Sequence, residues 1–329
     1  MVQFEERSEI EKGFAPIFAE RIAPELDRLD GERLSARAKG RRHLLISLGI
    51  GAVLGLAIWA LFGRGEGGAI GGGVVFAICA LIGFGLRASA AGDWAETLSA
   101  LVMPEVCAHL GGLDYIRGND GADFAFSRAA RLGLYGGYDR SKIRHRIAGA
   151  HRGVPFVVVD AELTDQQRDS DGKTKTVTVF RGMLFEIGVP QTSPGRILIA
   201  RDYGAMGNRI AGFFKGKQGR GLPRVETGHP RFEAAFELHA ERPDDAAAYL
   251  PAGLLDTLVD IAEHEGGSAR SMTAAFDGDL FFLALTRSES FLAFHGLNRP
   301  ASAIAEDLHG VFDDLTLVHR IIDRLADAG

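Results

Sequence analysis

One segment of the chain combines cations, aromatic side chains and glycines in a way that suits a membrane surface. Between Tyr203 and Val225 no acidic residue occurs, whereas five Lys and Arg residues alternate with apolar ones. Each cation near an anionic leaflet contributes about 1 kcal/mol of binding, and apolar side chains insert at the interface. The alternative is a surface loop whose charges are simply solvated. The candidate lipid-contacting residues are Arg209, Phe213, Phe214, Lys215, Lys217, Arg220 and Arg224.

Two histidines have the residue type of a metal site but the wrong surroundings. His145 and His151 lie within a stretch that also contains Arg140, Lys142, Arg144, Arg146 and Arg152. Because neighbouring cations repel a metal ion, these histidines are poor candidates for ligands. We expect an exposed basic stretch there.

A calcium-loop pattern is also incomplete. Asp169, Asp171 and Gly172 resemble the centre of an EF-hand loop, but the frame would begin at Gln167 and end at Thr178. Those two positions require an acidic ligand and a bidentate glutamate. The segment is therefore predicted to be a hairpin turn, and the sequence predicts no metal site.

Catalytic and cofactor motifs are missing from the sequence. There is no G-x-S-x-G elbow and no Walker loop, and the glycines at 63, 65 and 68 match a dinucleotide fingerprint without a preceding strand. A catalytic triad is recognised by geometry, so a scattered one stays open. The sequence favours a protein that is not an enzyme and has no cofactor.

Two apolar runs are long enough to span a bilayer. Residues 43–62 and 69–86 contain twenty and eighteen residues, and neither run has Asp, Glu, Lys or Arg. At 1.5 Å per residue the helices measure about 30 Å and 27 Å, which matches the hydrocarbon core. Because only six residues separate them, we predict a transmembrane helical hairpin over residues 43–86. A pair of helices buried in a soluble core is the alternative.

Basic residues are concentrated on one side of this hairpin. Five Lys and Arg residues lie between Arg33 and Arg42, and Arg87 follows the second run, whereas the turn contains only Arg64. Lys and Arg are enriched in cytoplasmic segments, so both termini are predicted to face the cytoplasm. Neither run contains a charged group that could serve as an ion path, which argues against transport by this chain alone.

Glycines recur at four-residue spacing in the hairpin. Gly51 and Gly55 lie in the first run, Gly68 directly precedes the second run, and Gly72 lies near its start. Small residues at this spacing let helix backbones approach closely. We expect them to pack the two helices of the hairpin together; association of two chains is the alternative.

The remaining sequence predicts an α+β protein. Residues 1–42 are expected to form an amphipathic polar helix, and residues 87–126 a connecting helix and a turn-rich linker. Residues 127–329 are expected to form a cytosolic α+β domain, which could divide into two subdomains near residue 226. Strand-like runs at Val154–Leu163 and Lys175–Ile187 flank turn residues, which indicates an antiparallel hairpin.

Further elements follow in the second half. Strands are predicted at Arg196–Ala200, Phe232–Ala240, Ser271–Phe276 and Leu280–Thr286, the last two joined across Asp277-Gly278. Helices are predicted at Ala246–Glu265 and Ala301–Ala326. Hairpin strands with helices set apart are typical of an antiparallel sheet with flanking helices.

Composition narrows the class of partner. The 329 residues carry a net charge of −6 and two cysteines. A mildly acidic chain gives no support to nucleic acid as a partner. Two cysteines in separate predicted helices indicate no disulfide framework.

Several segments together resemble a known family. They are Tyr138-Asp139, the GAHRGVPF stretch at Gly149–Phe156, Phe180-Arg181-Gly182 and the HPRFEAAFEL strand. With the preceding two-span hairpin, the chain is similar to the domain of unknown function 3137 family, bacterial membrane proteins with a shared cytosolic module. The resemblance covers nearly all of the chain after the N-terminal helix. It implies this architecture and a bacterial inner-membrane location, and it assigns no catalytic residue.

These observations lead to one functional expectation and two alternatives. We expect a non-enzymatic inner-membrane protein whose cytosolic domain binds a protein partner, or a second copy of itself, at the membrane surface. The first alternative is a module that engages anionic lipid through residues 209–224. The second is a membrane-tethered hydrolase whose site the sequence does not reveal.

Overall fold

The computed structural model describes most of the chain, in segments that divide into two compact units. Unit 1 is drawn from Met1–His109 and Ala293–Phe312, and unit 2 from Leu110–Leu292 and Asp313–Gly329. The predicted domain boundaries at residues 42, 86, 126 and 226 stay predictions. The residues described are 2–61, 66–120, 123–168, 172–201, 221–250, 252–264, 272–287, 292, 294 and 296–326.

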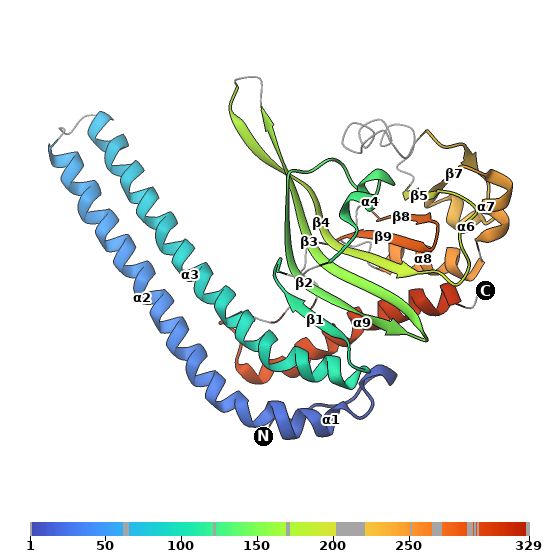
Figure 1. Ribbon diagram of the computed structural model, residues 1–329. Coiled ribbons are helices and arrows are strands. Elements are labelled where there is room, and N and C mark those ends of the chain that lie inside the picture. Colours follow the sequence, from blue (N-terminus) through green and yellow to red (C-terminus); the bar gives the residue numbers. More distant parts are fainter. Residues whose placement is uncertain are drawn as a thin grey trace. The chain divides into compact units, whose positions relative to one another are not determined.

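Unit 1 contains two long helices that lie side by side (Figure 1). Helix α2 spans Ala23–Leu61 and helix α3 spans Glu66–His109. Both apolar runs therefore continue as helix into the charged sequence that flanks them. Three short turns precede α2: η1 (Glu9–Glu11), α1 (Phe14–Ile17) and the π-helical turn η2 (Phe18–Ile22).

Unit 1 has an aromatic core beside the short turns that precede α2. The rings of Phe4, Phe14, Phe18 and Phe312 are buried together, with the Phe14 and Phe312 centroids 5.0 Å apart. Beside them the Nδ1 atom of His309 lies 2.8 Å from a carboxylate oxygen of buried Glu11. Turn η5 (Ala301–Ala303) and the first part of helix α9 (Ile304–Ala326) complete this unit.

Unit 2 is built on a nine-stranded sheet in which every pairing between the described strands is antiparallel. The predicted α+β class is confirmed. The strand order is β1-β2-β3-β4-β9-β8-β5-β7-β6. The strands are β1 (Asp114–Arg117), β2 (Arg140–His151), β3 (Val154–Arg168), β4 (Thr174–Gly188), β5 (Ile197–Arg201), β6 (Arg224–Val225), β7 (Phe236–Ala240), β8 (Met272–Asp277) and β9 (Leu280–Thr286).

Both faces of this sheet are covered at its centre. Successive residues Met183, Leu184 and Phe185 of β4 are all fully buried, although side chains alternate between the two faces of a strand. On one face, helix α4 (Phe126–Arg131) packs through Ala129 onto a cluster that includes Leu184 and Phe282. The other helices of the unit are α6 (Pro230–Glu233), α7 (Pro243–Tyr249), α8 (Ala252–His264) and the later part of α9.

Two predicted elements are each divided in the structure. The predicted strand Phe232–Ala240 begins only at Phe236, because Pro230 and the His229 imidazole, which accepts the Phe232 N–H at 3.2 Å, start helix α6 before it. The predicted helix Ala246–Glu265 is two helices: α7 ends at Tyr249, and α8 begins at Ala252.

Candidate functional site

The apolar surface of α2 and α3 is the largest exposed hydrophobic feature among the described residues. Apart from Leu34, every exposed large hydrophobic residue in the described part of the chain lies between Leu45 and Leu86. Only 6% and 11% of the residues in the most apolar stretches of the two helices are buried, whereas a core helix of a soluble domain is mostly buried. Both helices are long and apolar enough to cross a membrane.

The two helices approach each other most closely at glycines. A Cβ atom built on Gly72 would lie 2.5 Å from the carbonyl oxygen of Gly55, and one built on Gly55 would lie 2.9 Å from that of Gly72. A Cβ on Gly51 would lie 2.8 Å from the Cβ of Cys79. At these positions a methyl group does not fit without movement of a helix. Gly68, the fourth glycine of the predicted set, is buried.

Most of the predicted lipid-contacting segment lies outside the described residues. This applies to Arg209, Phe213, Phe214, Lys215, Lys217 and Arg220. Arg224 alone is described: it lies on β6, is exposed, and its Nη1 atom lies 4.0 Å from an oxygen of Glu237. Lipid binding by this segment therefore stays a prediction.

The expectation of an exposed basic stretch holds at Arg140, Lys142 and Arg152 but is wrong for Arg144–Arg146. Residues 144–146 lie in β2, in the interior of the sheet, and His145 is only 8% exposed. Its Nδ1 atom lies 2.8 Å from the Tyr115 hydroxyl. Burial, together with the charges of Arg117 and Arg144, lowers the pKa of His145 to about 4, so the imidazole is neutral at pH 7.

Carboxylates on the two neighbouring strands neutralise the arginines of β2. Arg144 donates to the carboxylates of Asp160 and Glu162 on β3, at 2.8 Å and 3.2 Å. Arg146 donates to Asp114 on β1 at 2.7 Å. Asp160 is only 1% exposed, and its pairing with Arg144 removes the cost of a lone buried charge. These partners are distant in sequence, which is why the basic run looked solvent-exposed.

His151, at the end of β2, meets the later part of α9. Its Nε2 atom lies 2.9 Å from the Asp323 carboxylate, and its ring stacks on that of His319 at 3.9 Å. Burial and the nearby His151 lower the pKa of His319 to about 4, while Asp323 opposes this shift. Among the described residues no group of three or more His, Cys, Asp or Glu side chains could hold a metal ion.

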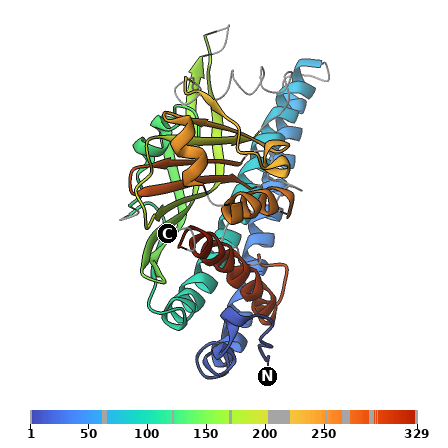
Figure 2. The same cartoon turned by 90° about the vertical axis from the view of Figure 1, so that its right-hand side faces the viewer.

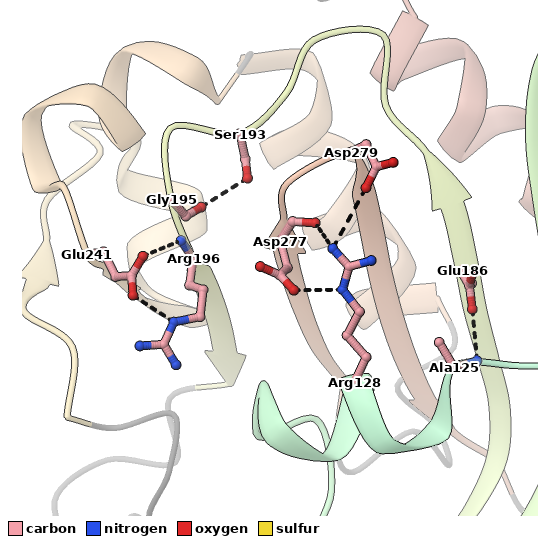
Figure 3. Close-up of polar contacts among 9 residues, drawn as sticks. All are labelled: Ala125, Arg128, Glu186, Ser193, Gly195, Arg196, Glu241, Asp277 and Asp279. Carbon is pink, nitrogen blue, oxygen red and sulfur yellow. Dashed lines mark hydrogen bonds and ion pairs between the residues drawn. The ribbon is translucent and has the colours of Figure 1, made fainter.

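A polar cluster in unit 2 fastens α4 to the sheet (Figure 3). The Arg128 guanidinium donates to a carboxylate oxygen of Asp277 at 2.7 Å and to its carbonyl oxygen at 2.6 Å, and lies 3.7 Å from Asp279. Glu186 of β4 accepts the N–H of Ala125, just before α4, at 3.0 Å. Because these carboxylates are held by a guanidinium or a backbone N–H, we interpret the cluster as structural.

A second polar contact in Figure 3 joins β5 to the end of β7. Glu241 accepts the backbone N–H of Arg196 at 3.0 Å and its side-chain Nε–H at 2.7 Å. The backbone contact first, and then the side-chain contact, lower the pKa of Glu241. Such a carboxylate stays ionised near pH 7 and fixes the loop, and it is unsuited to donate a proton.

The ends of β3 and β4 project beyond the rest of the sheet as a two-stranded arm (Figures 1 and 2). We call residues 165–168 and 174–180 the β arm. Strand β2 pairs with β3 only as far as Thr164, and β9 pairs with β4 only from Gly182. The arm strands therefore pair only with each other among the described strands. The predicted hairpin was shorter, since it ended at Leu163 and began again at Lys175.

One edge of the β arm has no partner strand among the residues that the structure describes. On the β3 side, the Gln166 N–H donates to the Asp139 carboxylate at 2.9 Å. On the β4 side, residues 174–180 have no neighbouring strand among the described residues. Their sequence, TKTVTVF, is rich in the β-branched residues that favour strands. An open edge of this kind is a template for pairing with another chain.

Comparison with known proteins gives one family and one structural likeness. No curated protein matches the chain. The crystal structure of the mycobacterial trehalose monomycolate transport factor A, TtfA, aligns with 63% of this chain and 88% of its own, at 11% identity and a TM-score of 0.30, which is too low to establish a shared fold. The model of the family described as "Protein of unknown function (DUF3137)" matches residues 178–326. The resemblance noted in the sequence is thereby confirmed over residues 178–326 of the chain.

Proposed function

We propose that this chain is a non-enzymatic protein of a bacterial inner membrane that presents a protein-binding sheet at the cytoplasmic surface. The helical hairpin would anchor the chain, with both termini in the cytoplasm. A protein partner would bind unit 2 by adding a strand along residues 174–180 of the β arm. The observation that carries the proposal is the β4 edge of that arm, which no described strand covers.

The edge suits strand addition for physical reasons. Isolated two-stranded hairpins are marginally stable, and a third strand supplies the missing pairing. In β-strand addition, backbone hydrogen bonds give affinity and alternate side chains give specificity. Along this edge Lys175, Thr176 and Thr178 are exposed, so their side chains are accessible to a partner.

The anchor is supported by charge and exposure. The exposed apolar side chains between Leu45 and Leu86 match the chemistry of lipid tails. The concentration of Lys and Arg before residue 43 and at Arg87 supports a cytoplasmic location for that end of the hairpin. Close approach at Gly55 and Gly72 supports packing of the two spans against each other.

The test is photo-crosslinking of the tagged full-length protein in cells. A photoreactive amino acid would replace Thr176 or Thr178, with exposed Ala150 of β2 as the control position outside the arm. We expect one prominent crosslinked protein from the two arm positions and none from Ala150. Mass spectrometry of the crosslinked band would identify it.

A shortened arm provides the matched variant. Thr164 pairs directly with Thr178, so Asn-Gly in place of residues 165–177 would close a two-residue hairpin while keeping the sheet. The variant should keep the wild-type unfolding temperature and lose the partner on purification. Recovery of the same partner with the shortened arm, or of no partner from any position, would contradict the proposal.

A further inference from the structure

A groove in unit 1 lies where the predicted first span begins. It has a volume of about 890 Å³, which is within the range of ligand sites. Its lining runs along α2 from Leu34 to Ile46 and includes Arg87 of α3 and residues 296–298. Twelve residues of helix rise by about 18 Å, so the groove extends from the charged part of α2 into the apolar run.

The groove separates charge from apolar surface along its length. Four arginines line it, Arg37, Arg41, Arg42 and Arg87, and none of its described lining residues is acidic. All four are exposed, and no described carboxylate forms an ion pair with any of them. Apolar side chains continue the lining on the membrane side of these arginines, at Leu44, Leu45 and Ile46.

The wall formed by residues 296–298 is fixed to α2 by buried contacts. The Arg33 side chain is 8% exposed and donates to the carbonyl oxygen of Leu297 at 2.9 Å. Asp30 accepts from Arg33 at 2.8 Å and from the Ala301 N–H at 2.9 Å. Arg33 therefore fixes the wall of the groove in place. The four lining arginines are not used for this, and their N–H donors remain available for a ligand.

We propose that this groove binds an anionic phospholipid of the inner leaflet. The phosphate would contact Arg41, Arg42 and Arg87, and an acyl chain would lie along Leu44, Leu45 and Ile46. Guanidinium groups bind phosphate oxygens through paired N–H donors, and basic pockets at the cytoplasmic side of membrane helices hold anionic headgroups. This proposal rests on the proposed membrane insertion of the hairpin, and it is independent of the β arm and of residues 209–224.

The test is native mass spectrometry of the full-length protein in detergent micelles. The probes are phosphatidylglycerol, which is anionic, and phosphatidylcholine, which is not. Arg41→Gln/Arg87→Gln should weaken phosphatidylglycerol binding about 30-fold, which corresponds to about 2 kcal/mol for two cations. Ala38→Phe, which fills the groove without changing any charge, should abolish the preference for phosphatidylglycerol.

A charge-matched control separates this site from diffuse attraction. Arg28 and Lys39 are exposed cations of α2 that do not line the groove, so Arg28→Gln/Lys39→Gln should leave binding within about threefold of wild type. Equal losses in the two double variants, or no preference for phosphatidylglycerol in the wild type, would overturn the site. Release of the protein from membranes by alkaline carbonate would overturn the anchor itself and the groove with it.

Discussion

Substitution of one glycine tests the packing of the two long helices. In Gly72→Ala the new Cβ would lie 2.5 Å from the Gly55 carbonyl oxygen, whereas ordinary contact begins at 3.4 Å. The helices must therefore separate locally by about 0.9 Å, and overpacking of this kind costs about 1–3 kcal/mol. Alanine also favours a helix over glycine by about 0.5–1 kcal/mol, which offsets part of that cost.

Gly73→Ala is the matched control, because a Cβ on Gly73 meets nothing within 4 Å. Both variants gain the same helix propensity, so the difference between them isolates the packing cost of about 1–3 kcal/mol. In the assay, increasing SDS separates α2 from α3, and the loss of energy transfer between two dyes reports the separation. The dyes are attached at Ser35→Cys and Ser89→Cys in a background of Cys79→Ala and Cys107→Ala. Gly72→Ala should separate at a lower SDS fraction than Gly73→Ala. Equal midpoints would refute the packing.

Three further predictions concern unit 2, each measured by chemical unfolding of the full-length protein in micelles. Gly182→Ala should cost more than about 3 kcal/mol, because φ is +148° and a Cβ would lie 2.1 Å from the Leu285 carbonyl oxygen; wild-type stability would contradict this. Arg128→Met should cost about 1–2 kcal/mol and the more exposed Arg196→Met less than about 1 kcal/mol, and the reverse order would count against the structural role of Arg128. His145 is neutral when folded, so its contribution is present above pH 6.5 and is lost as the pH falls towards 4, by about 3 kcal/mol at most. His145→Gln should flatten that pH dependence, and an unchanged slope would be inconsistent with the depressed pKa.

The apolar helices could be predicted because each is marked by a short, continuous stretch of sequence. The two uncharged runs predicted helices, and the structure has helices there: α2 begins well before the first run, and α3 extends beyond the second run at both ends. Helix was also predicted on either side, within residues 1–42 and 87–126, but the sequence did not show that Arg33–Arg42 joins the first run in one continuous helix, because this segment contains no apolar periodicity. Its helix is held partly by contacts with residues far along the chain, such as Arg33 with Leu297.

The missed strand shows where sequence reasoning stops. β2 has a basic sequence, and its partners Asp114 and Asp160 belong to different strands. Charge neutralisation across strands depends on register, which no local pattern gives. The turn between β8 and β9 shows a smaller error of the same kind: Asp277 pairs with Leu280, so the two turn residues are Gly278 and Asp279 rather than Asp277 and Gly278.

The candidate sites could be predicted only in part from the sequence. The Asp171-Gly172 turn predicted the hairpin of β3 and β4, but the point at which β2 and β9 stop pairing, which creates the open edge, is a property of the whole sheet. The arginines before residue 43 were recognised as an orientation signal. Their arrangement around a groove depends on residues 296–298, which lie more than 200 positions away.

The most direct test of the membrane anchor is the accessibility of single cysteines in whole cells. A membrane-impermeant maleimide would be applied to Gly67→Cys, Ser35→Cys and Ser89→Cys, each in a background of Cys79→Ala and Cys107→Ala. If the hairpin spans the inner membrane with both termini in the cytoplasm, the reagent labels Gly67→Cys as soon as the outer membrane has been made permeable. It then reaches the other two only after the inner membrane is opened. Labelling of Ser35→Cys or Ser89→Cys in cells with an intact inner membrane would contradict this account.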